Sequence, residues 1–103
     1  MTDIEIIQTN ALDQLNDTIT FWYSPTEEII SDDGWTYHKV YEETYEETAA
    51  TEELAKKCCE KFYCEFNTKE KEFIYRLDDG KSKETGVTLL IQAITMFNTI
   101  YFK

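Results

Sequence analysis

The side chains that could perform acid–base or metal chemistry in this 103-residue chain are one histidine, three cysteines and many carboxylates. His38 is the only histidine. If residues 35–45 form a strand, it points away from Trp35, Tyr37 and Tyr41. A general base needs converging partners, and the sequence offers none beside it. We therefore expect His38 to be a solvated surface residue.

Cys58, Cys59 and Cys64 lack the Cys-x-x-Cys spacing that lets two thiolates converge on one metal ion. On a helix, neighbouring side chains diverge by about 100°. Three cysteines, two of them adjacent, also make a poor disulfide framework, which indicates a reducing cytosol. We expect free thiols in or beside the core, no metal site and a cytoplasmic location.

Other signatures of catalysis or cofactor binding are missing from the sequence. There is no Gly-x-Ser-x-Gly motif, and the three glycines are not spaced as a phosphate-binding loop. The Asp-Asp-Gly segments at 32–34 and 78–80 lack the remaining ligands of an EF-hand, so we expect turns there. With 21 acidic residues, some carboxylate pairs arise by chance. The sequence predicts no enzyme and no cofactor.

Negative charge is the strongest pattern in the chain. The formal net charge is −11, and residues 1–53 hold 14 acidic residues against one basic residue, Lys39. Residues 39–54, KVYEETYEETAATEEL, contain six glutamates and repeat Tyr-Glu-Glu-Thr. Such a surface repels nucleic acid and anionic membranes as direct partners. A charged partner must therefore be basic.

The acidic run spaces its carboxylates regularly in either regular backbone conformation. In a strand, same-side neighbours are about 6.8 Å apart, and in a helix i,i+4 neighbours are about 5–6 Å apart between Cβ atoms. Such spacing imitates nucleic-acid phosphates, and interleaved tyrosines add contact area typical of interface hot spots. The candidate partner-binding residues are Glu27, Glu28, Asp32, Asp33, Tyr41, Glu42, Glu43, Tyr45, Glu46, Glu47, Glu52 and Glu53.

In general character the chain is similar to phage-encoded nucleic-acid mimics that disarm restriction or CRISPR nucleases, although it shares no motif with them. This similarity implies an inhibitor of a nucleic-acid-binding enzyme that acts in the cytoplasm of the host cell. One alternative is an immunity protein that neutralises a cationic nuclease toxin. Another is an assembly protein with a solvated acidic face, which could form homo-oligomers through Phe97, Tyr101 and Phe102 near the C-terminus.

The elements that must position these residues are predicted from periodicity. A capping box at 2–5 and apolar residues at helical spacing predict a helix over residues 3–16, with a short strand as the alternative. Residues 18–23 and 35–45 are predicted strands joined by an acidic loop at 25–34. A helix is expected over about 52–65 and a strand over 73–77.

The segment 86–102 is ambiguous, because its β-branched residues favour a strand while its length favours a helix. Four polar residues of this segment fall on one side when placed at helical periodicity, but scatter over both faces at strand periodicity. We therefore expect a helix. The chain is long enough for one hydrophobic core. The sequence thus predicts a single α+β domain over residues 1–103, in the order α-β-β-α-β-α, with a short antiparallel sheet packed by helices.

Overall fold

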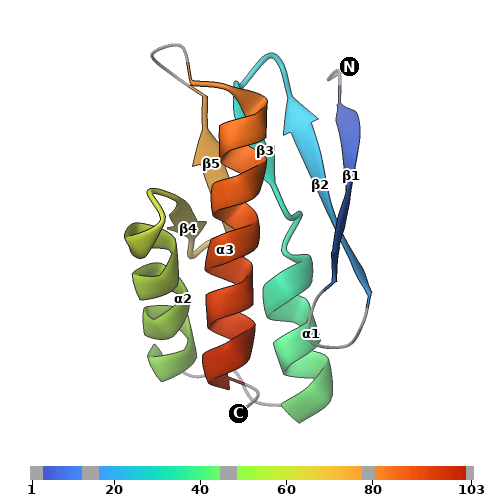
Figure 1. Cartoon of the computed structure of the whole chain (residues 1–103). Helices are drawn as coiled ribbons and strands as arrows, with labels where there is room; N and C mark the ends of the chain where they lie inside the picture. The colour runs from blue at the N-terminus through green and yellow to red at the C-terminus, as the bar shows by residue number, and fades with distance from the viewer. Residues whose placement is uncertain (1–3, 13–16, 45–48, 78–80, 102–103) are drawn as a thin grey trace.

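The computed structural model describes residues 4–12, 17–44, 49–77 and 81–101, without the side chains of residues 40–44 and 101. Within these ranges a five-stranded antiparallel sheet, in the order β1-β2-β3-β5-β4, is covered on one side by three helices (Figure 1). The α+β class and the antiparallel sheet are confirmed. The elements are β1 (Glu5–Leu12), β2 (Thr18–Ser24), β3 (Ile29–Ser31), α1 (Trp35–Thr44), α2 (Ala49–Lys61), β4 (Glu65–Asn67), β5 (Glu72–Arg76) and α3 (Lys83–Tyr101).

The order of the elements differs from the predicted one, first at the N-terminus. Residues expected to form a helix over 3–16 form strand β1, which was the alternative. Ile7 and Ala11 are four residues apart, a spacing that places them on one face in a helix and in a strand alike. Exposure along β1 alternates with a period of two from Ile6 onward, as expected for a strand. Pairing with β2 therefore favours the strand over the helix.

The second difference follows β2, which forms as predicted. The predicted loop 25–34 contains strand β3, three buried residues that pair with both β2 and β5. The predicted strand 35–45 is helix α1. Trp35 and Tyr37 were expected on one side, but Tyr37 is buried in the core whereas Trp35 is 51% exposed. Their opposite environments show that the two-residue spacing was not the period of this segment.

The helices α2 and α3 form where they were expected, and α3 lies between α2 and α1 (Figure 1). Helix α2 ends earlier than predicted. The Tyr63 N–H donates to the Glu60 carbonyl and the Cys64 N–H to the Cys59 carbonyl, while Tyr63 has a φ of 61°. These two bonds are those of a Schellman motif, which frees the following residues to form β4.

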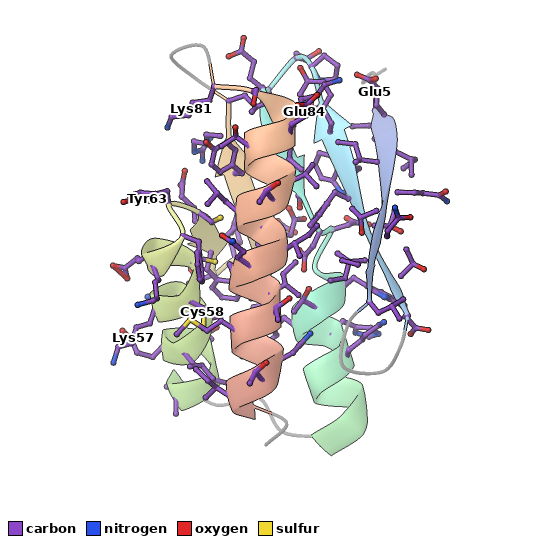
Figure 2. The ribbon with its side chains drawn as sticks, in the orientation of Figure 1. Glu5, Lys57, Cys58, Tyr63, Lys81 and Glu84 are labelled. Atoms are coloured by element: carbon purple, nitrogen blue, oxygen red, sulfur yellow. The ribbon has the colours of Figure 1, made fainter. Side chains whose placement is uncertain are left out.

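The core lies between the sheet and the helices. Phe21 of β2 and Phe73 of β5 face Phe97 of α3, with 5.5 Å between the ring centroids of Phe73 and Phe97. Cys58 of α2 points toward α3 (Figure 2). Gly86 marks the closest approach of α3 to the sheet.

Replacing Gly86 with alanine tests this close approach. A Cβ there would lie 2.5 Å from Tyr75 Cδ2 and 3.0 Å from Ile30 Cδ1. We expect Gly86→Ala to lower the free energy of unfolding by about 1–2 kcal/mol, since overpacking outweighs the better helix propensity of alanine. Urea denaturation measures it, with the exposed Thr88→Ala on the same helix as control. A Gly86→Ala variant more stable than the wild type would contradict this close packing of α3 against the sheet.

Candidate functional site

Asp32, at the junction of β3 and α1, is buried at 3% exposure. Its Oδ1 accepts hydrogen bonds from the backbone N–H groups of Gly34 (3.0 Å) and Phe73 (2.9 Å), and its Oδ2 accepts one from Thr36 (3.0 Å). It therefore caps the N-terminus of α1 and ties it to β5. Asp32 was a candidate contact residue, and that prediction is wrong because its side chain is inaccessible.

Burial raises the pKa of the Asp32 carboxyl, while hydrogen bonds from Thr36, Phe73 and Gly34 act in the opposite direction. The positive end of the α1 dipole also favours the charged form. The helix start is therefore stabilised by a group that is itself costly to bury.

More carboxylates gather around this cap. Asp33 is exposed, with a φ of 58°. Glu70 precedes β5, and Glu72 is its first residue. Burial raises the pKa of Glu72, the Ser31 hydroxyl lowers it by donating a bond of 2.8 Å, and the charges of Asp32, Asp33 and Glu70 raise it. These four carboxylates, Asp32, Asp33, Glu70 and Glu72, form the carboxylate cluster.

An open cleft of about 390 Å³ borders this cluster. The Trp35 and His38 rings, with centroids 5.7 Å apart, form one part of its wall. The Lys71 amine is ion-paired with Glu52, so it is engaged within the protein. An aromatic face beside carboxylates suits a cationic group, above all the planar guanidinium of arginine. We call this site the acidic cleft; its lining residues are Asp33, Gly34, Trp35, Tyr37, His38, Glu70 and Lys71.

The only basic residue of the acidic half is held inside the protein. The side chain of Lys39 is 7% exposed, and its Nζ lies 2.7 Å from Asp17 Oδ2 and 5.2 Å from the Trp35 ring centroid. This ion pair offsets one aspartate.

The candidate residues do not form one continuous row in the described part of the chain. Glu27 and Glu28 are exposed in the β2–β3 turn, at the opposite end of the molecule from the C-terminal end of α1 (Figure 1). Glu52 is half-buried against Lys71, and Glu53 is exposed.

The Tyr-Glu-Glu-Thr repeat is only partly described. Positions 41, 42 and 43 belong to α1, while Tyr45, Glu46 and Glu47 lie outside the described residues. Position 42 follows His38 by four residues in α1. Position 41 follows the buried Tyr37 by one turn.

Glu70 and Glu72 were missed by sequence reasoning. Both belong to the half of the chain whose acidic and basic residues nearly balance, so charge counting gave no signal. Only the pairing of β3 with β5 brings them beside residues 32–33. The carboxylates that a cationic partner could contact therefore come from both halves of the chain.

His38 is exposed as expected, and it contacts Trp35. Cys58, Cys59 and Cys64 are free and buried, also as expected. Burial raises the pKa of the Cys58 and Cys59 thiols and that of Cys64 to about 12. No three His, Cys, Asp or Glu side chains within the described ranges could together hold a metal ion.

The C-terminal element differs from expectation in one respect. Phe97 was a candidate for an exposed oligomer contact, but it is fully buried between the helices and the sheet because α3 turns this side toward Phe73. Phe102 and the Tyr101 side chain lie outside the description. None of the helices found in residues 4–12, 17–44, 49–77 and 81–101 could cross a membrane.

Removing the cap should destabilise the protein. Asp32→Ala leaves the N–H groups of Gly34, Thr36 and Phe73 without their acceptor, so we expect a loss of at least about 2 kcal/mol in unfolding free energy. Asp33→Asn is the control, because asparagine tolerates a positive φ and the side chain is exposed. Equal stability of the two variants in urea would refute the capping role.

Glu72 should make stability depend on pH. Its pKa in the folded protein is raised above the ordinary value of 4.5. The folded state therefore binds the proton more tightly, and this contribution, full below that value, is lost as pH rises through the folded pKa. We expect Glu72→Gln to flatten the decline in unfolding free energy above pH 4.5, measured by urea denaturation across pH. Parallel wild-type and variant curves would contradict this.

Comparison with protein-family models, curated proteins and solved structures gives no match for this chain.

Proposed function

We propose that this protein binds a basic protein through its acidic cleft and the adjacent glutamates, and so keeps a nucleic-acid-binding enzyme from its substrate. One observation carries the proposal. Residues 1–53 hold 14 acidic residues against a single base, and that base is enclosed in an ion pair with Asp17. Lysines of the other half pair with Glu52 and Glu5. The remaining excess of negative charge in this half supports binding of a basic partner.

The cleft supplies a place where a cationic side chain can be desolvated. Asp33 and Glu70 provide carboxylate acceptors, and Trp35, half-exposed, provides a ring face. An arginine from the partner would stack on the indole and donate to the carboxylates. Such an anchor resembles the Trp and Arg pairs that dominate interface energies.

The adjacent glutamates supply the extended field. Position 42 lies one turn after His38 in α1, and Glu43, Glu46 and Glu47 follow it in the sequence. A row of carboxylates steers a basic groove toward the protein and competes for the sites that phosphates occupy. Inhibition would then be competitive with nucleic acid and weaken as salt rises.

A second candidate is an immunity protein for one cationic nuclease toxin. The compact cleft with its aromatic wall favours it, since such a site fits one side chain of a cognate partner. The two functions differ in competition. A mimic displaces nucleic acid from its target, whereas an immunity protein can bind beside the active site while nucleic acid stays bound.

Neutralising the cleft tests the proposal. We expect the pair Asp33→Asn with Glu70→Gln to weaken partner binding by at least about tenfold, which corresponds to 1.4 kcal/mol, because both acceptors lose their charge. The control is Glu60→Gln with Glu84→Gln, an equal charge change at exposed positions of α2 and α3. The partner is recovered from nuclease-treated host lysate, and its affinity is measured by titration.

The repeat requires a separate variant, with Glu42, Glu43, Glu46 and Glu47 all changed to glutamine. We expect it to lower the steepness of the salt dependence and to lose competition against labelled DNA for the recovered protein. Wild-type potency in this variant and in the cleft variant would overturn the proposal. Binding that persists with DNA still bound would favour the immunity protein.

A further inference from the structure

The strand β1 lies at an open edge of the sheet. It pairs with β2 on one side, and no described element lies beyond it (Figure 1). At eight residues it is far longer than β4, the three-residue strand at the other edge. An edge strand carries a row of unpaired N–H and C=O groups that can pair with another strand.

This edge has little of the protection that usually blocks strand addition. Its sequence EIIQTNAL has no lysine and no proline, and its only charge, Glu5, stands at the upper end (Figure 2). Ile6 is 65% exposed and Leu12 is 56% exposed. The one protective irregularity is a bulge in β1 itself, which advances four residues from Gln8 to Leu12 while β2 advances two, from Thr20 to Thr18.

We propose that β1 pairs with β1 of a second copy of this chain, antiparallel and centred on Gln8. A two-fold axis there places Ile4 opposite the second copy's Leu12, on the sheet face turned away from the helices. It also places Gln8 opposite its own counterpart. Ile4 and Leu12 are both exposed in the single chain, so pairing buries apolar surface while it satisfies the backbone groups.

The charge pattern disfavours two of the neighbouring registers. With Gln8 at the centre, each Glu5 faces Ala11, and the two glutamates stand six residues apart, about 20 Å, beyond the Debye length of about 8 Å at physiological salt. Centring on Ile6 would bring the two Glu5 positions within two residues, about 7 Å. Centring on Thr9 would align Glu5 with position 13, another acid in the sequence.

This association responds to salt in the opposite sense from the proposed binding of a basic partner. Two copies, each with a net charge of −11, repel, so added salt should strengthen the dimer. Binding through the acidic cleft should weaken under the same change. Failure of one proposal therefore leaves the other intact.

Analytical ultracentrifugation across protein and salt concentration is the first test. We expect a mass near twice 12.2 kDa, favoured by salt. Gln8→Lys should restore the monomer, because two lysines would face each other at the axis even though the net charge falls. Thr20→Lys is the matched control, since Thr20 is exposed and pairs with Gln8 from the inner strand. A wild type that stays monomeric, or a Gln8→Lys variant that still dimerises, overturns the proposal.

Cysteine cross-linking tests the register. Oxidised glutathione should convert Gln8→Cys to a covalent dimer, because the two thiols face each other and reduce the glutathione disulfide to two thiols. Asn10→Cys should not cross-link, since the introduced thiol of the second copy would be four residues away, about 14 Å. The native cysteines are buried with raised pKa values and should stay unreactive. Equal cross-linking of the two variants would contradict the proposed register. A monomeric protein whose β1 pairs only with another protein would contradict the proposal that the occupant is a second copy of this chain.

Discussion

The buried carboxylate of Asp32 is the interaction on which the candidate site depends. It accepts hydrogen bonds from the first turn of α1 and from Phe73 of β5, so it fixes the helix relative to the sheet. Trp35, His38 and position 42 all belong to that helix. The direction in which α1 leaves the sheet therefore sets where the aromatic wall and the acidic run lie. A single capping residue links the fold to the surface that a partner would meet.

The same neighbourhood concentrates negative charge beyond what the fold requires. Burial raises the pKa of Glu72, and the charges of Asp32, Asp33 and Glu70 raise it further. A cation in the acidic cleft would offset this charge and favour the charged form of Glu72. Groups with perturbed pKa values are common at functional sites, because a bound partner can stabilise the charged form that the free protein disfavours.

Sequence reasoning was reliable where one period dominated. The strand β2, the helices α2 and α3 and the strand β5 each carry a long or unmixed pattern. It failed for short elements whose residue pattern fits more than one type of secondary structure. Ile7 and Ala11 fit both periods, β3 has three residues, and Asp32 acts as a helix cap where a turn before a strand was expected. Tyr63 occupies a left-handed position that usually signals glycine.

The candidate site was predictable only in part, for a related reason. Asp33 stands in the acidic half and was identified, but Glu70 and Glu72 reach it through pairing between β3 and β5. Long-range pairing of a three-residue strand leaves almost no trace in the sequence. The burial of Asp32 was likewise invisible, since nothing in its local sequence distinguishes it from Asp33.

Carboxyl footprinting of the complex with the recovered basic partner tests whether the acidic cleft is the binding surface. Exposed carboxylates are labelled with a carbodiimide and an amine, and labelling is quantified by mass spectrometry with and without the partner. We expect Asp33 and Glu70 to lose labelling on binding, while the exposed Glu60 and Glu84 keep theirs. Unchanged labelling at Asp33 and Glu70, with protection elsewhere, would contradict it.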